Sequence, residues 1–201
     1  MTGAERKTNF IDSTIAMVAK VGMENLRTKQ IAEAVGLSEA SMFRYFGSKE
    51  EILREAFFVV DKRVSALLSG SRHIDELKTE SIIDVAYKIW LDVYHYLLEH
   101  RDETLFLIRY RYSAYYTDEV RSQRQAYSGA FDYAYDLLEA QFGTPDATYR
   151  GFAINYIFEL TLCFAEKIVT GRVKESKDLE SRLWGSIKGA LGSLILSSKQ
   201  V

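Results

Sequence analysis

The 201-residue sequence contains a single proline and a single cysteine, and neither sign of charge is in large excess. Average usage would give about ten prolines, and prolines lie mostly in turns, so long helices with short connections are expected. The lone Cys163 excludes a disulfide framework and a cysteine-based zinc site. No apolar run approaches the ~18 residues of a membrane span, and the polar stretch from Met1 to Lys7 does not resemble a signal peptide. We therefore expect a soluble cytoplasmic protein.

The composition is that of a globular protein, with 47% hydrophobic and 27% charged residues. Apolar residues recur at helical spacing, and no alternating strand pattern is longer than a few residues. The sequence therefore predicts an all-α fold of about nine helices. Cap and break residues place these helices at 10–21, 28–35, 38–45, 48–68, 79–101, from 102, 117–138, 144–170 and from 178.

Residues 28 to 46 have the spacing of a helix-turn-helix unit. Ala32 is small enough for two helices to cross, and Gly36 tolerates the positive φ of a tight turn. The apolar residues that would hold the unit together follow at the required intervals: Ile31, Val35, Leu37 and Met42. Such a unit presents a short second helix to the major groove of DNA. From spacing alone, an ordinary pair of antiparallel helices in a bundle remains the alternative.

Two segments in the stretch from Ile11 to Ile52 resemble the DNA-binding region of TetR-family transcriptional regulators. They are IAEAVGLS at 31–38 and MFRYFGSKEEI at 42–52. That family typically has I-A-x-x-A-G-V-S followed by L-Y-x-H/Y-F-x-S-K-E-x-L. The resemblance implies a homodimer with a DNA-binding domain at 1–50 and an effector-binding and dimerisation domain at 51–201. It covers about a quarter of the chain.

The resemblance also assigns contacts with double-stranded DNA. Thr28 and Lys49 would contact phosphates, and the first turn of the recognition helix would reach base edges. The full set of expected DNA-binding residues is Thr28, Glu39, Ala40, Ser41, Phe43, Arg44, Tyr45 and Lys49.

Two of these residues depart from the family pattern. Phe43 replaces the usual tyrosine, so it keeps a ring for a thymine methyl group and loses the phosphate-directed hydroxyl. Glu39 replaces a neutral or basic residue, and a carboxylate can accept a hydrogen bond from cytosine N4 but is repelled by phosphates. Alternatively, Glu39 only complements the helix dipole. Residues 1–63 hold ten Lys and Arg against nine Asp and Glu, so DNA binding would depend on a few well-placed contacts.

Twenty of the 26 aromatic residues follow residue 60, and as a set they favour a cavity for a mostly apolar or aromatic effector. For any single residue, filling of the core is the alternative. Glu159 is a candidate ligand anchor, an ion-pair partner for a residue such as Arg109, or an exposed side chain. We expect the segment from Arg109 to Tyr116 to form an exposed helix face, with a relay role as the alternative. The expected pocket residues are Trp90, Tyr94, Phe106, Tyr110, Phe131, Tyr135, Phe158, Glu159 and Leu162.

The last helix has an apolar arc that is too wide for one neighbouring helix. Gly185, Gly189 and Gly192 lower its helix propensity, which is understandable if a partner helix approaches closely. We expect the last two helices of each protomer to form a four-helix dimer interface, and a wholly intramolecular bundle is the alternative. The expected interface residues are Leu183, Trp184, Ile187, Ala190, Leu191 and Leu194.

No constellation of catalytic or metal-ligating residues is apparent, so we expect neither an enzyme nor a cofactor. The function that the sequence favours is a ligand-responsive transcriptional repressor. An activator, an effector-independent regulator and a helical ligand carrier without DNA binding are the alternatives. A ligand-responsive dimer would act by changing the separation of its recognition helices, which must fit half-sites about 34–36 Å apart or a multiple of that.

Overall fold

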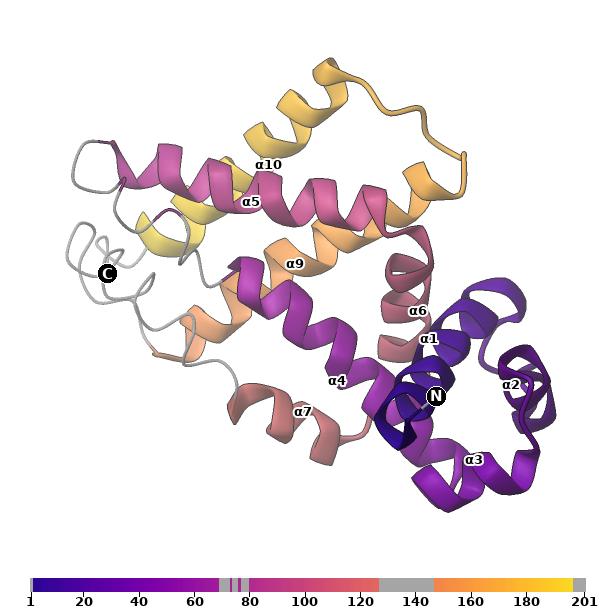
Figure 1. Ribbon diagram of the computed structural model, residues 1–201. Coiled ribbons are helices and arrows are strands. Elements are labelled where there is room, and N and C mark those ends of the chain that lie inside the picture. The colour runs from indigo at the N-terminus through magenta and orange to yellow at the C-terminus, as the bar shows by residue number, and fades with distance from the viewer. Residues whose placement is uncertain (1, 69–72, 74–75, 77–79, 127–146, 197–201) are drawn as a thin grey trace. The chain divides into compact units, whose positions relative to one another are not determined.

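A computed structural model describes residues 2–68, 73, 76, 80–126 and 147–196 (Figure 1). These residues form nine α-helices and no strand, which confirms the predicted all-α fold. The helices are α1 (Gly3–Val21), α2 (Thr28–Val35), α3 (Glu39–Phe46), α4 (Lys49–Leu68), α5 (Ile82–Glu99), α6 (Arg101–Arg111), α7 (Asp118–Ala126), α9 (Ala147–Val169) and α10 (Lys177–Leu196).

Several helix boundaries differ from the predicted ones by a few residues. The first helix begins at Gly3, well before the predicted Phe10, because Thr2 and Glu5 form a capping box. The Thr2 hydroxyl accepts from the Glu5 N–H at 3.2 Å, and the Glu5 carboxylate accepts from the Thr2 N–H at 2.6 Å. The predicted start signals at Thr79 and Pro145 lie outside the described residues.

The chain divides into two compact units. The first unit contains the described residues of 1–63 and 100–127, and the second contains those of 64–99 and 128–201. The division predicted from the resemblance, at residue 50, is a functional one and stays a prediction. The two compact units divide the chain differently, because α6 packs against α1 and so belongs to the first unit.

In the first unit, α1 packs against both α2 and α6, and α2 packs against α3. The side chains between them are fully buried and mostly aromatic or branched, as expected for a core that fixes short helices. They include Phe10, Val18, Ile31, Met42, Ile52, Leu53 and Phe57.

In the second unit, α9 packs against α5 and α10. Trp90 and Tyr94 of α5 and Leu183 and Ile187 of α10 form one buried cluster. The indole N–H of Trp90 donates to the hydroxyl of Thr161 in α9 at 3.1 Å. Within the described part of the chain, no helix is both long enough and apolar enough to cross a membrane.

Candidate nucleic-acid interface

A left-handed glycine joins α2 to α3, at the position that the sequence predicts. Gly36 has a φ of 71°, and its N–H donates to the carbonyl of Glu33 at 3.0 Å. The N–H of Leu37 donates to the carbonyl of Ala32, also at 3.0 Å, which closes the turn. Ala32 is 1% exposed and lies on the inner face of α2. The helix-turn-helix geometry is therefore present.

Serine caps fix the starts of the two helices that follow. The Ser38 hydroxyl accepts from the N–H of Ser41 at 3.2 Å, and the Ser48 hydroxyl accepts from the N–H of Glu51 at 3.1 Å. In a reciprocal capping box the Glu51 carboxylate would return to Ser48. Here it accepts two hydrogen bonds from the Arg54 guanidinium, at 2.7 and 3.1 Å.

The helix α3 buries one face and presents the other to solvent. Met42 is fully buried, whereas Phe43 is 41% exposed. Ala40 and Arg44 are exposed beside Phe43. These three predicted DNA-binding residues form the outer surface of α3.

Ser41 and Tyr45 are partly engaged within the chain. The Ser41 hydroxyl lies 3.0 Å from that of Ser38. The Tyr45 ring lies 6.0 Å from the ring of Phe10, and the Arg44 guanidinium lies 5.9 Å from the Tyr45 ring. Tyr45 therefore belongs in part to the core of the first unit.

Thr28 is the first residue of α2, and its N-cap is Arg27 rather than Thr28 itself. The Thr28 hydroxyl donates a hydrogen bond to the carboxylate of Glu39, the first residue of α3. Both side chains are partly buried. The sequence predicted separate roles for these residues on DNA, and the structure joins them to each other.

Lys49 begins α4 and also makes contacts inside the chain. Its ammonium donates to the carbonyl of Leu26 at 2.7 Å, two residues before α2 starts, and lies 5.9 Å from the ring of Tyr115. Sequence spacing missed this arrangement because Leu26 and Tyr115 are distant from Lys49 along the chain. Lys49 therefore helps to position the start of α2.

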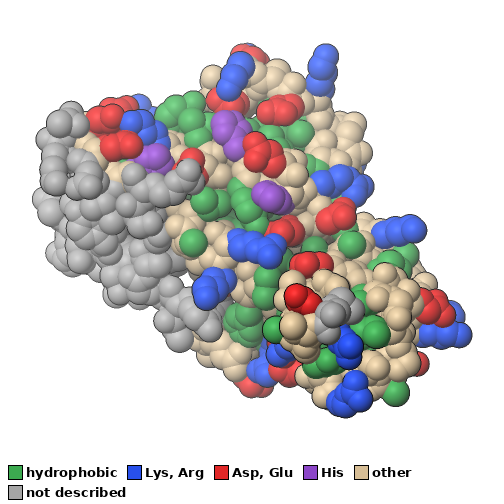
Figure 2. All heavy atoms as spheres, viewed as in Figure 1, with side chains coloured by type: hydrophobic (Ala, Val, Ile, Leu, Met, Phe, Trp, Pro, Cys, Tyr) green, Lys and Arg blue, Asp and Glu red, His purple; other side chains and the backbone are tan. Residues whose placement is uncertain are grey.

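Positive and negative side chains are interspersed over the surface seen in Figure 2, rather than gathered in one basic patch. This distribution agrees with the nearly balanced charges of residues 1–63. An interface with DNA on this chain would depend on individual contacts more than on a strong overall field.

Comparison with known proteins identifies this arrangement. Residues 10–56 match the family model of "Bacterial regulatory proteins, tetR family". The helix-turn-helix region of this chain therefore matches that of TetR-family regulatory proteins. The matched residues include the helix-turn-helix and the first turns of α4.

Solved structures of TetR-family proteins share the fold over nearly the whole chain. A TetR family transcription regulator from Marinobacter aquaeolei VT8 aligns with a TM-score of 0.75 and 18% identity, over 93% of this chain and 95% of that one. The fatty acid degradation regulator FadR from Bacillus halodurans aligns with a TM-score of 0.64 and 14% identity, over 97% of each chain. Among curated relatives, the nucleoid occlusion factor SlmA of Actinobacillus pleuropneumoniae is 22% identical over 86 residues. That match spans 42% of this chain and 43% of the relative.

Within the first unit, α6 and the segment after it contact α1 and α4, the helices on either side of the helix-turn-helix unit. Tyr110 is 1% exposed, and its ring stacks on that of Phe57 in α4 at 4.6 Å. Burial raises the pKa of Tyr110 to about 12. The Arg109 guanidinium donates to the carbonyl of Val18 near the end of α1. The expectation of an exposed helix face was therefore wrong for Tyr110 and only partly right for Arg109, because both residues contact the N-terminal helices.

The predicted pocket residues fall into two groups. Phe106 and Tyr110 are buried in the first unit, where their rings lie 5.8 Å apart. The second unit holds the others that are described, of which Glu159 is partly buried and the rest are buried: Trp90, Tyr94, Phe158, Glu159 and Leu162. Phe131 and Tyr135 lie outside the described residues. The structure thus assigns Phe106 and Tyr110 to the core of the first unit.

The predicted interface residues on α10 differ in their burial within the chain. Leu183 and Ile187 are 6% and 1% exposed, because they pack against Trp90 and Tyr94 of the same chain. The Trp184 ring lies 5.7 Å from that of Trp90. Leu183 and Ile187 therefore belong to the chain's own core, and their place in a dimer interface stays a prediction. Ala190 is partly buried, and the side chains of Leu191 and Leu194 lie outside the description.

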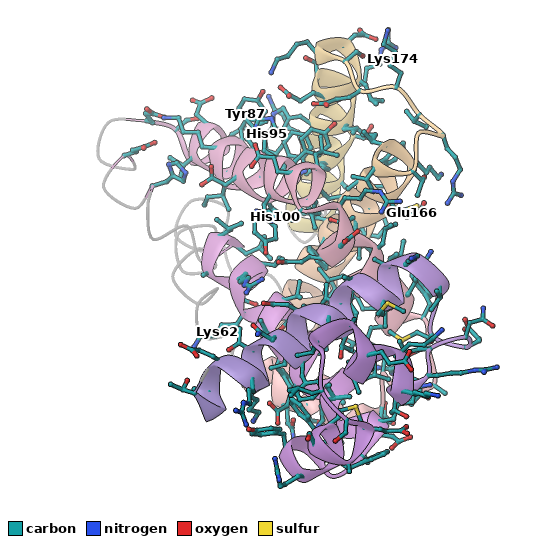
Figure 3. The ribbon with its side chains drawn as sticks, turned by 45° about the vertical axis from the view of Figure 1, so that its right-hand side comes forward. Lys62, Tyr87, His95, His100, Glu166 and Lys174 are labelled. Atoms are coloured by element: carbon teal, nitrogen blue, oxygen red, sulfur yellow. The ribbon has the colours of Figure 1, made fainter. Side chains whose placement is uncertain are left out.

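Sequence reasoning missed a buried carboxylate on α10. Glu180 is 5% exposed and accepts hydrogen bonds from Lys177 at 3.2 Å and Tyr87 at 3.4 Å, with a His95 ring nitrogen also at 3.4 Å. Figure 3 shows Tyr87 and His95 on α5, on the side turned to α10. Burial opposes ionisation of Glu180, but the bonds from Lys177 and His95 outweigh it and lower its pKa. The available signal was helical spacing, since Glu180 shares one row with Leu183 and Ile187.

Proposed function

We propose that this chain is a homodimeric transcriptional regulator that binds double-stranded operator DNA. In this proposal it acts as a repressor, and a small, mostly apolar or aromatic effector releases it from the operator. The observation that carries the DNA-binding part is the exposed surface of α3, where Ala40, Phe43 and Arg44 point to solvent from a capped helix-turn-helix unit.

The proposed contacts divide by position. Residues at the exposed face of α3 would meet base edges, whereas Thr28 and Lys49 would meet phosphates. An ammonium has three donors, so Lys49 retains two after its bond to Leu26. The Thr28 hydroxyl has a single proton, which it donates to the Glu39 carboxylate.

The effector part is supported by the aromatic character of the second unit. Trp90 stacks with Tyr94 at 5.0 Å and lies 5.7 Å from Trp184. Aromatic side chains of this kind bind apolar and aromatic molecules. An effector would act by binding one separation of the recognition helices better than another.

Fluorescence anisotropy on duplex DNA from upstream of the chain's own gene, measured over a salt series, tests the proposal. We expect salt-dependent binding that resists competitor DNA and that Arg44→Ala weakens about tenfold or more. Arg121→Ala is the matched control, because Arg121 is an exposed arginine on α7 whose replacement changes the charge equally. Equal binding by the two variants, or no fragment retained in a genome-wide selection, would contradict the proposal.

The same assay tests the effector and the mode of regulation. We expect an apolar or aromatic compound from a small-molecule library to lower the anisotropy of the protein–DNA complex. A promoter placed under the bound sequence should then be more active when the regulator gene is deleted. Lower activity after the deletion would identify an activator.

A further inference from the structure

The hydrogen bond between Thr28 and Glu39 links the first residues of the two helices of the helix-turn-helix unit. Thr28 Oγ1 donates to Glu39 Oε1, and both side chains are partly buried. A threonine hydroxyl carries one proton, so it can donate to one acceptor at a time. While the bond to Glu39 lasts, Thr28 cannot donate to a phosphate.

A contact between Thr28 and the DNA backbone requires the Thr28–Glu39 hydrogen bond to break. Phosphate oxygens only accept hydrogen bonds, so a contact from the Thr28 hydroxyl requires its proton to leave Glu39. The carboxylate would then lie in a partly buried position without that donor and close to another anion. Leaving a charged acceptor without a partner is costly, so the phosphate contact is disfavoured unless a new donor replaces the hydroxyl.

One base supplies that donor without a competing acceptor in the same place. Cytosine presents only its N4 amino group in the major groove, and a carboxylate is the side chain that accepts from it. Adenine also offers an amino group, but beside the N7 acceptor, which repels a carboxylate. Glu39 is in the first turn of α3, which is the part of a recognition helix that meets base edges.

We propose that Thr28 and Glu39 exchange partners on DNA, and that this exchange selects for cytosine. Where cytosine lies opposite Glu39, its N4–H binds the carboxylate, and the Thr28 hydroxyl turns to a phosphate. At other bases the Thr28–Glu39 bond persists and the phosphate contact is not made. This inference rests on the proposed DNA binding and goes beyond it, because it couples a backbone contact to the choice of a base.

A double-mutant cycle of Thr28→Val and Glu39→Ala tests the coupling. The full-length proteins are used with a fluorescein-labelled pool of random-sequence duplexes, and each also selects sequences from that pool. We expect the wild type to enrich cytosine at one position of each half-site and Glu39→Ala to lose this preference. Glu39→Ala should also raise the affinity for the unselected pool about threefold to tenfold, because Thr28 is released to the phosphate. In the presence of Thr28→Val, the same change should raise the affinity much less.

Two further variants control for charge and for folding. Glu33→Ala removes the same charge from an exposed position on α2, where the side chain is 64% exposed, and should leave the cytosine preference intact. Glu39→Gln keeps an acceptor for Thr28 and should move the selected base from cytosine to adenine, the base that glutamine binds. It also provides a test if Glu39→Ala does not fold.

The possible results distinguish failure of the proposed Thr28–Glu39 exchange from failure of the proposed DNA binding. Retained cytosine preference in both Glu39 variants, or an equal effect of Glu39→Ala with and without Thr28→Val, would overturn the exchange. If the wild type nevertheless binds DNA and Arg44→Ala weakens that binding, the proposed function stands. Absence of salt-dependent binding by the wild type would overturn both.

Discussion

At the scale of single residues, Lys49 has a structural role in the first unit and a proposed role on DNA. Its bond to the Leu26 carbonyl and its position over Tyr115 hold the start of α2 in place. The remaining ammonium donors are free to neutralise a phosphate. Replacement of Lys49 should therefore affect stability as well as DNA binding, and the two effects can be measured separately.

We predict that Lys49→Ala lowers the free energy of unfolding by about 1 kcal/mol, measured by urea titration, because a partly buried carbonyl loses its donor. It should weaken DNA binding about equally on all sequences and reduce the salt slope by about 0.9 for each phosphate that the variant no longer neutralises. The control Lys62→Ala, at an exposed position of α4, should leave stability within about 0.5 kcal/mol. An unchanged salt slope for Lys49→Ala would show that Lys49 does not bind a phosphate.

Two variants of Tyr110 measure the contributions of its ring and of its hydroxyl to stability separately. Tyr110→Phe keeps the stack on Phe57 and loses the hydrogen bond to the Tyr115 carbonyl, so we expect a loss of about 1 kcal/mol. Tyr110→Ala removes a buried ring and should cost about 3–5 kcal/mol. Urea unfolding followed by circular dichroism measures both. Similar losses for the two variants would show that the hydroxyl, rather than the stack, stabilises this contact.

At the scale of elements, the turn between α2 and α3 depends on one backbone conformation. An added Cβ at Gly36 would meet no atom within 4 Å, so the cost of a side chain there comes only from its φ of 71°. We predict that Gly36→Ala lowers the free energy of unfolding by about 1–2 kcal/mol. Gly36→Asn should cost less, because asparagine adopts the left-handed conformation more readily. A larger loss for asparagine than for alanine, in the same urea titration, would contradict this explanation.

A histidine clamp near the start of α5 makes the second unit sensitive to pH. His73 is 17% exposed, and its two ring nitrogens lie 3.1 Å from a Glu76 oxygen and 3.0 Å from an Asp92 oxygen. Lys88 faces Glu76 and Glu80, each at 2.7 Å. Burial lowers the pKa of His73, but the bonds to the two carboxylates outweigh it, so the pKa is raised above its usual 6.5.

A raised pKa means that the folded chain holds the proton more tightly than the unfolded chain. The stability from protonated His73 is therefore complete below about pH 6.5 and is lost as the pH rises through the higher folded pKa. We predict that the difference in unfolding free energy between wild type and His73→Gln shrinks as the pH is raised from acidic to alkaline. Asp92→Asn should reduce this pH dependence. A difference that grows with pH in urea titrations would contradict the clamp.

At the scale of the whole molecule, the exposed side of α10 is the feature that the single chain does not explain. An added Cβ at Gly185 or Gly189 would meet nothing within 4 Å, so packing inside the described chain does not require glycine there. Each glycine costs a helix about 1 kcal/mol relative to alanine. A partner helix that approaches closely would account for this cost, which keeps α10 in the proposed dimer interface even though Leu183 and Ile187 are buried in the chain's own core.

We predict that Gly189→Arg converts the proposed dimer to monomers, because a long charged side chain keeps a partner helix away. Sedimentation velocity measures the change in mass. Thr8→Arg, at an exposed position of α1, is the control and should remain dimeric. If Gly189→Arg also remains dimeric at micromolar concentration, this side of α10 is not the interface.

Sequence reasoning was most successful where the responsible interactions are local. The turn at Gly36 was predicted from spacing and the cap at Ser38 from its residue type, and the structure confirms both. Of the capping box expected from Ser48 to Glu51, only the Ser48 hydroxyl bond is present. The predicted roles of Thr28 and Glu39 were separate, because nothing in their spacing shows that one side chain donates to the other. The exposed surface that contains Phe43 and Arg44 was predicted from the resemblance together with the pattern of α3.

The sequence by itself determined that the described part of this chain is built of helices, that it carries a helix-turn-helix unit, and where that unit turns. These features depend on residues within a few positions of one another, such as Gly36 with Glu33 and Ser38 with Ser41. Only the tertiary structure decided that Tyr110 supports α4 and that Leu183 and Ile187 fill the chain's own core. An amphipathic helix shows which side is apolar, but not which of several apolar surfaces covers it, because the hydrophobic effect has no direction.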